Sequence, residues 1–131
     1  MKNKTTQSVA LLFTIFSLAS CSPRMVGNWS VQRFSTAQPG QQGVSLTNIG
    51  TVHFNKNGTG EKNLQYSALG VTNTDQNPFK WTWTEGKYVT IEGENSAFAK
   101  TWIIMTNKKK YQKWKTTDGA NNVQTIELKK N

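Results

Sequence analysis

The sequence predicts an all-β fold: a small eight-stranded antiparallel up-and-down β-barrel that follows a cleaved N-terminal signal segment. Three observations lead to this prediction. Short segments rich in β-branched and aromatic residues alternate apolar and polar side chains, which is the pattern of half-buried strands. Turn signals such as Asn57-Gly58 and Asp118-Gly119 separate these segments. After the signal segment, no stretch has the periodicity of an amphipathic helix.

The N-terminal segment has the three zones of a secretory signal. Lys2 and Lys4 precede an apolar run from Val9 to Leu18, and small residues follow the run. The run is about ten residues long, whereas a helix needs roughly twenty to cross the hydrocarbon core of a bilayer. We therefore expect residues 1–20 to be a signal peptide that is removed, and not a permanent transmembrane helix.

Cys21 is the only cysteine of the chain and directly follows the signal segment. The sequence Leu18-Ala19-Ser20-Cys21 resembles the lipobox of bacterial lipoproteins, which implies that Cys21 becomes the first mature residue and carries a lipid. The alternative is an ordinary signal peptide with an unrelated cysteine near its cleavage site. The complete box favours lipidation, and so does the lack of a second cysteine for a disulfide.

Cleavage at the lipobox divides the chain into a signal peptide (1–20), a short lipid-anchored tether (21–26) and one barrel domain (27–131). The 111 residues that remain after removal of the first 20 suit one domain with a modest core. By analogy with other lipoproteins, Ser22 permits sorting to the outer membrane, and the residues after it carry no acidic export signal. We expect a barrel that is anchored in the outer membrane and faces the periplasm.

Four strands are expected in the first half of the domain. Residues 28–34 (NWSVQRF) alternate apolar and polar side chains, and residues 50–54 (GTVHF) end just before an Asn-Gly turn. Residues 61–67 (EKNLQYS) alternate again after this turn. Residues 79–85 (FKWTWTE) place three aromatic rings on one face, opposite a lysine and two threonines.

Four further strands follow at a regular spacing. They are 87–93 (KYVTIEG), 99–107 (AKTWIIMTN), 110–116 (KYQKWKT) and 123–129 (VQTIELK). Turn signals separate them at a rhythm typical of an antiparallel meander. Closing such a meander into a barrel covers both edges of the sheet.

Two connections between the expected strands are long and polar: residues 35–48 and residues 68–78. Unstructured loops of this length are uncommon in compact domains and often cover binding sites. We expect 35–48 to be a loop that lies over one end of the barrel.

The motifs of the first strands resemble those of lipocalin-like β-barrel lipoproteins of Gram-negative cell envelopes. Gly27 and Trp29 match the G-x-W that opens the first strand of lipocalins, where the tryptophan plugs one end of the barrel. Residues 52–61 look like the strand, Asn-Gly turn and strand of the lipoprotein branch, and residues 79–93 look like its central hairpin. The resemblance runs from about 27 to 128. The domain is shorter than a typical secreted lipocalin and shows no C-terminal helix, so the resemblance does not define the depth of a pocket.

The sequence holds few candidates for catalysis. His53 is the only histidine, and its neighbours Val52 and Phe54 point to the opposite face, so we expect it to face solvent. A metal site would need further ligands. Glu92 and Glu94 share a strand face, as a paired-carboxylate hydrolase requires, but acids beside a turn are usually solvated. With no nucleophile elbow or phosphate-binding loop, we expect no enzyme activity, no cofactor and no metal.

The basic residues are concentrated near the C-terminus. The chain has 16 Lys and Arg against 7 Asp and Glu, and eight of the lysines lie from Lys100 onward against two acids. This region favours an anionic partner, the alternative being a solvated face that keeps the protein soluble. We expect no nucleic acid, because an exported lipoprotein meets little of it.

Two functions remain. In the first, the barrel binds a small apolar or amphiphilic ligand against Trp81, Trp83 and Trp102, with Tyr111, Lys113 and Lys115 as contacts for an acidic head group. In the second, the barrel is filled, and the lipoprotein contacts an anionic envelope partner through its lysine-rich C-terminal strands. An eight-stranded barrel is just wide enough to be filled by side chains or to hold one ligand. A continuous cavity would favour the first function, and a close-packed interior the second.

Overall fold

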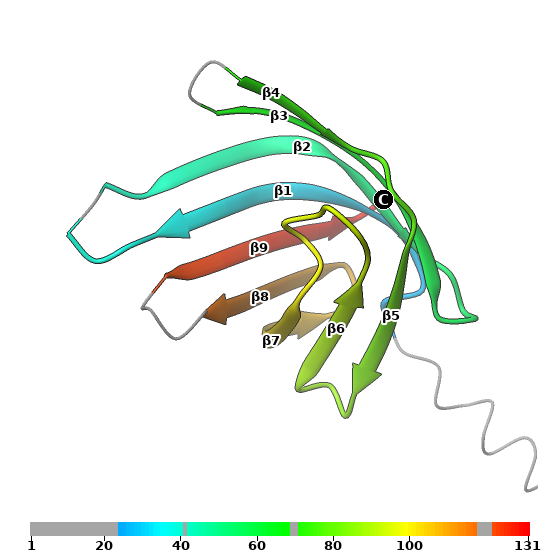
Figure 1. Cartoon of the computed structure of the whole chain (residues 1–131). Coiled ribbons are helices and arrows are strands. Elements are labelled where there is room, and N and C mark those ends of the chain that lie inside the picture. Colours follow the sequence, from blue (N-terminus) through cyan, green and yellow to red (C-terminus); the bar gives the residue numbers. More distant parts are fainter. Residues whose placement is uncertain (1–23, 41, 69–70, 118–121) are drawn as a thin grey trace, which may run out of the picture.

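An antiparallel sheet of nine strands closes on itself to form a barrel (Figure 1). The structure is a computed structural model and describes residues 24–40, 42–68, 71–117 and 122–131. These residues contain no helix. The strands are β1 (Gly27–Ala37), β2 (Val44–Phe54), β3 (Thr59–Ala68), β4 (Val71–Asp75), β5 (Phe79–Thr84), β6 (Tyr88–Glu92), β7 (Thr101–Lys108), β8 (Tyr111–Thr117) and β9 (Val123–Lys130).

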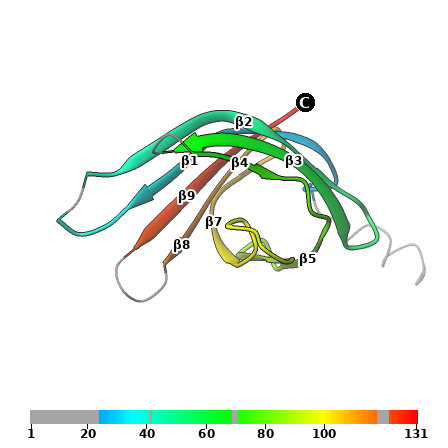
Figure 2. The same cartoon turned by 45° about the horizontal axis from the view of Figure 1, so that its top comes forward.

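Pairing between β2 and β3 closes the barrel. The strand order is β2-β1-β9-β8-β7-β6-β5-β3-β4, and every pairing is antiparallel. Eight strands complete the ring, and β4 is an extra strand beside the second half of β3 (Figure 2). The sequence prediction of an eight-stranded antiparallel barrel is confirmed.

β4 and β5 are the two halves of one interrupted strand. Both pair with β3 in the same register, since Leu64 lies opposite Asp75 and Gly60 lies opposite Phe79. Residues 76–78 separate the halves and end in a proline, which has no N–H to donate to a neighbouring strand. At this interruption β3 and β4 continue as a two-stranded ribbon, while β5 stays in the barrel wall (Figure 1).

The two connections expected to be long loops are largely strands, and the prediction was wrong there. The segment 35–48 is the tip of a hairpin, because β1 continues to Ala37 and β2 begins at Val44. The segment 68–78 contains β4. Both segments lie where the sheet extends past the barrel, so neither alternates buried apolar with polar side chains. Without that alternation, the sequence pattern of a strand is missing.

Aromatic rings fill the barrel. The buried rings are Trp29, Phe54, Phe79, Trp81, Phe98, Trp102 and Trp114. Phe54 makes edge-to-face contacts with three of them, at ring-centroid distances from 5.3 to 6.1 Å. Such contacts contribute beyond the area that the rings bury.

Trp29 closes one end of the barrel, which we call the base. Its side chain is fully buried at the start of β1, and its Nε1 donates a hydrogen bond of 2.8 Å to the carbonyl oxygen of Met25. The Nζ of Lys130 lies 5.5 Å from the centre of its ring. At the base β1 begins, β9 ends, and β2–β3, β5–β6 and β7–β8 are connected. The opposite end, where β1 passes to β2 and β6 passes to β7, is called the mouth.

Candidate functional site

The mouth is where an internal ligand would enter, and it is closed. The hollow that remains there has a volume of about 10 Å³. It is lined by Phe34, Leu46, Ile49, Leu64, Tyr66, Asp75, Ala97 and Phe98. A volume of this size holds about one water molecule. In the part of the chain that the structure describes, the barrel interior therefore has no room for a small-molecule ligand.

A segment between β6 and β7 closes the mouth, and we call these residues, 93–100, the plug (Figure 1). Phe98 is the fully buried side chain of the plug. The centre of its ring lies 6.0 Å from that of Phe79, 6.1 Å from that of Trp102 and 6.2 Å from that of Trp114. Its carbonyl oxygen accepts a hydrogen bond of 2.9 Å from Nε1 of Trp102. Phe98 thus completes the aromatic core from the mouth side.

A buried ion pair lies beneath the plug. The Nζ of Lys62, on β3, is 2.9 Å from Oδ1 of Asp75, at the end of β4, and the side chains are 0% and 9% exposed. Lys62 also donates a 2.6 Å hydrogen bond to the carbonyl oxygen of Asn77. The other carboxylate oxygen of Asp75 accepts a 2.5 Å hydrogen bond from the hydroxyl of Ser96. One charge pair therefore joins β3, β4, the strand interruption and the plug.

Sequence reasoning did not identify Phe98 or the Lys62–Asp75 pair. A signal for the pair was present, because strand alternation puts Lys62 on the same face as Leu64 and Tyr66. A lysine on an apolar strand face predicts a buried partner. No such periodic signal marks Phe98, since the plug has no regular secondary structure.

The three tryptophans expected to line a cavity are part of the core or its edge. Trp81 and Trp102 are buried, and Trp83 is partly buried against the core. The Nε1 of Trp81 donates hydrogen bonds to the carbonyl oxygens of Asn55, at 3.1 Å, and Thr59, at 3.0 Å. Trp81 thus lies beside the β2–β3 turn at the base, whereas Trp102 lies under the plug.

The expected head-group contacts lie on the other side of the barrel wall. Along β8, Gln112 and Trp114 are buried, so the intervening Tyr111, Lys113 and Lys115 are on the outer face. The structure therefore does not bring these three residues together with Trp81 and Trp102. The wall of β8 separates the two groups.

Tyr111 belongs to a small polar cluster on this outer face. Its hydroxyl donates a 2.5 Å hydrogen bond to Oε1 of Glu127, and Oε2 of Glu127 is 3.4 Å from Nε of Arg33. Burial raises the pKa of Tyr111 to about 12, helped by the hydrogen bond to Glu127 and the charge of that carboxylate. The guanidinium of Arg33 acts in the opposite direction.

Two open hollows flank the plug. One has a volume of about 410 Å³ and a polar lining that includes Thr36, Thr116 and Lys100, whose Nζ donates a 2.5 Å hydrogen bond to Gln124. The other has a volume of about 660 Å³ and is lined in part by Glu92 and Glu94. Both hollows are open at the surface, and the core ring of Phe79 borders the larger one.

The remaining candidates for chemistry are dispersed. The ring of His53 is on the outer face, with Nδ1 2.5 Å from Oδ1 of Asn28, and both Glu92 and Glu94 are exposed. No group of three or more His, Cys, Asp or Glu within the described ranges is placed to hold a metal ion. Cys21, the signal segment and the Asp118-Gly119 turn lie outside the described residues.

Lysines dominate the surface of β7, β8 and β9. Lys108, Lys109, Lys110 and Lys129 are exposed. The acidic side chain described in these strands is Glu127, which is engaged with Tyr111 and Arg33. Glu127 also lies opposite Lys113 in the β8–β9 ladder, and the cations of the described strands outnumber this one acid.

Comparisons with known proteins identify no relative of this chain. No protein family, curated protein or solved structure gives a match to this chain. The closed barrel of eight antiparallel strands is consistent with a lipocalin-like fold. Among the described residues, no helix is long and apolar enough to span a bilayer.

Proposed function

We propose that this protein is a non-enzymatic lipoprotein of the Gram-negative cell envelope, with a filled, lipocalin-like barrel that serves as an interaction module. It contacts an anionic envelope partner through its lysine-rich C-terminal strands. The observation that carries the proposal is the packed interior, where the plug leaves a hollow of only about 10 Å³. A barrel without room for cargo acts through its surface, and the surface of β7–β9 is cationic.

The lipid anchor rests on the sequence around Cys21. The complete lipobox and the absence of a partner cysteine support acylation at this residue, and Ser22 supports sorting to the outer membrane. In the proposal the barrel faces the periplasm on a short tether. Replacing Cys21 by Ala tests the anchor, because the Cys21→Ala protein should leave the detergent phase on phase partitioning. Unchanged partitioning would contradict the proposed lipidation.

A second candidate function is the binding of an apolar or amphiphilic ligand, and the apolar rim of the mouth favours it. Phe34, Leu46 and Tyr66 pack against the core but are only partly buried. Displacement of the plug would join their surfaces to the ring of Trp102, which lies 6.3 Å from the ring of Phe34. A ligand would then replace Phe98 in the core.

Native mass spectrometry of the purified protein with its co-extracted lipids separates the two functions. The filled barrel predicts no bound molecule other than the covalent lipid. In a parallel titration of delipidated protein with fatty acids, lysophospholipids and sterols, tryptophan emission should stay constant, because the indoles are already packed. A co-purified ligand, or a shift in emission together with a higher melting temperature, would overturn the filled barrel in favour of the carrier.

A further inference from the structure

The basic side chains of the barrel are concentrated at its base, the end that receives the tether. Several backbone hydrogen bonds bring the chain segments of the base together. The amide of Lys130 donates to the carbonyl of Lys110 at 2.9 Å, and the amide of Asn131 donates to that of Asn28 at 3.0 Å. The amide of Ile104 donates to the carbonyl of Lys87 at 2.9 Å. The β5–β6 and β7–β8 turns and the end of β9 therefore belong to one end of the barrel.

Each connection at the base carries exposed cations. They are Lys56 between β2 and β3, Lys87 between β5 and β6, and Lys108, Lys109 and Lys110 around the β7–β8 turn. Arg24, which precedes β1, is also exposed. The acids at this end are Glu85, in the β5–β6 turn, and Glu61, whose carboxylate accepts hydrogen bonds from Asn55 of the β2–β3 connection, so the cations outnumber them. At the mouth, by contrast, Lys100 is accompanied by Glu92, at the end of β6, and by Glu94 of the plug.

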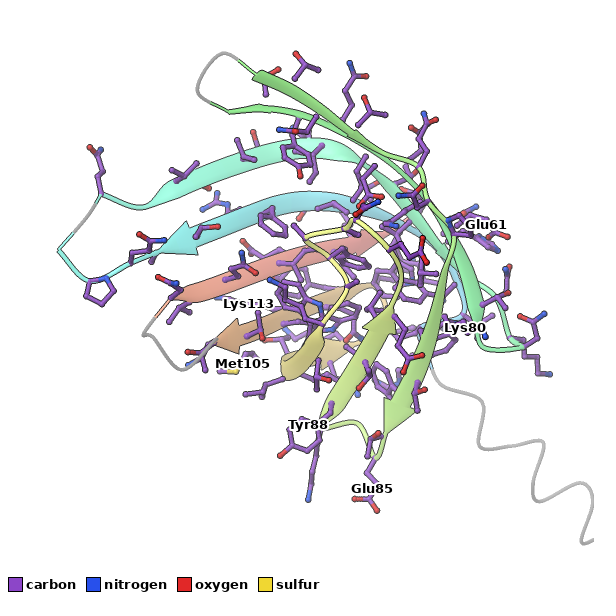
Figure 3. All side chains as sticks on the ribbon, viewed as in Figure 1. Glu61, Lys80, Glu85, Tyr88, Met105 and Lys113 are labelled. Atoms are coloured by element: carbon purple, nitrogen blue, oxygen red, sulfur yellow. The ribbon has the colours of Figure 1, made fainter. Side chains whose placement is uncertain are left out.

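Exposed apolar side chains lie beside these cations. Tyr88 directly follows Lys87 and is 45% exposed, and its cross-strand neighbour Ile103 is 39% exposed. Met105, further toward the base on β7, is 54% exposed. Figure 3 shows Tyr88 and Met105 projecting outward from neighbouring strands, with Glu85 at the tip of the adjoining turn. Lysines beside a tyrosine and aliphatic side chains are typical of proteins that lie at a bilayer surface.

We propose that the base docks on the anionic surface of the bilayer that holds the anchor, with Lys108–Lys110 against lipid head groups and Tyr88 and Met105 at the interface. The inference deepens the proposed function by naming the anionic partner, and it rests on the proposed anchor at Cys21. Met25 is buried in the barrel and hydrogen-bonded to Trp29, so the part of the tether that can extend is at most residues 21–24, which reach about 14 Å. The tether thus holds the base, and not the mouth, against the membrane. Lysines near an anionic leaflet are attracted within a Debye length, so this docking depends on salt.

The test uses the purified mature lipoprotein in vesicles of phosphatidylcholine, with or without phosphatidylglycerol. Lysines are labelled with an amine-reactive reagent, and the rate at each position is read by mass spectrometry. We expect labelling of Lys108–Lys110 to be slowed roughly fivefold in the anionic vesicles, the effect of about one favourable contact per lysine. Lys100, at the mouth, is the internal control and should label equally in both. Equal rates at Lys108–Lys110 in the two vesicles would overturn the docking.

Two variants locate the docking surface. Replacing Lys108, Lys109 and Lys110 by Gln should abolish the difference in labelling of Lys87 between the two vesicles. The matched double variant, Lys113→Gln with Lys115→Gln, removes charge from the outer face of β8 and should leave that difference intact. If the Lys113→Gln and Lys115→Gln variant lost the difference and the Lys108–Lys110 variant kept it, the contact would lie on the outer face of β8, which would contradict the inference.

The outcome for the anchor is read separately. The intact mass of the protein shows whether Cys21 carries a lipid. If it does not, the proposed anchor fails, and the same labelling in an excess of vesicles still decides whether the base binds anionic lipid. Protection of Lys108–Lys110 in neutral vesicles as well would indicate crowding by the tether alone and would overturn the charge-dependent contact.

Discussion

At the scale of single residues, the Lys62–Asp75 pair shows how charge is used inside this barrel. Burying two charges costs free energy that their attraction does not always return, so such a pair is weak evidence for added stability. Its position is more informative. In the register of β3, Lys62 lies opposite the interruption between β4 and β5, and its ammonium binds both Asp75 and the carbonyl of Asn77. The pair satisfies polar groups where the sheet ladder is broken.

Removing one partner of this pair should therefore be costly. Lys62→Met leaves the carboxylate of Asp75 buried beside Ser96 without its cation, and we expect the free energy of unfolding to fall by about 3–5 kcal/mol. Adding Asp75→Asn removes the remaining charge, and the double variant should recover part of the loss. Urea unfolding measures both effects. A loss below about 1 kcal/mol in Lys62→Met would indicate that water already screens the pair.

Tyr111 gives a prediction for pH dependence. Its pKa is about 12 in the folded protein and about 10 in an unfolded chain, so folding favours the protonated phenol. The stability that this difference contributes is fully present below pH 10 and is lost as the pH rises toward 12. In Tyr111→Phe that part of the alkaline destabilisation should be absent. Ultraviolet titration should show a tyrosine ionisation near pH 12 that is missing from Tyr111→Phe, and an ionisation that persists in this variant would contradict the shift.

At the scale of elements, the sequence predicted the strands that face the core and missed those that do not. The segment FKWTWT alternates rings with polar side chains and forms β5 as expected. The segment VTNTD forms β4, and its residues Thr72, Asn73 and Thr74 are all exposed. Because no side chain alternates between core and solvent there, hydrophobic periodicity cannot reveal the pairing of β4 with β3. Periodicity has the same limit for the predicted ligand contacts. The alternation of β8 correctly places Lys113 and Lys115 on one face, but it does not say that this face is outside.

The plug is the element on which the filled interior depends. Truncating Phe98 to Ala should cost about 3–5 kcal/mol, because the ring leaves a cavity among Phe79, Trp102 and Trp114. An apolar cavity in a packed core binds small apolar molecules. We therefore expect benzene to raise the melting temperature of Phe98→Ala and to leave that of the native protein unchanged.

Phe34→Ala is the matched control for this experiment. Phe34 is only partly buried at the rim of the mouth, so its loss should destabilise the protein less and create no benzene site. Stabilisation of the native protein by benzene would mean that the plug already opens in solution. That result would favour the carrier function over the filled barrel.

At the scale of the whole molecule, the strength of pairing varies around the barrel wall. β1 and β9 pair over eight residue positions, whereas β3 and β5 pair over two, Thr59 with Lys80 and Gly60 with Phe79. The seam between β3 and β5 is short because β4 occupies the second half of β3. Gly60 is required at this seam, since a Cβ there would lie 2.2 Å from the ring of Phe79. The barrel is closed there by two paired positions, by the ring of Phe79 against Gly60, and by the hydrogen bond from Nε1 of Trp81 to the carbonyl oxygen of Thr59.

Local opening should therefore begin at the β3–β5 seam. Proteins open in units whose free energy depends on how much pairing and packing each unit breaks. Amide hydrogen exchange in β5 should accordingly be faster than in β1 and β9, although all three lie in the same closed sheet. Lys62→Met, which removes the contact of β3 with the interruption before β5, should accelerate exchange in β5 further. The β8–β9 pair does not contact Lys62 and should keep its native rate. Uniform exchange across the barrel, or equal acceleration in β8 and β9, would mean that the molecule opens only by global unfolding, and that the charge pair stabilises the whole barrel instead of its seam.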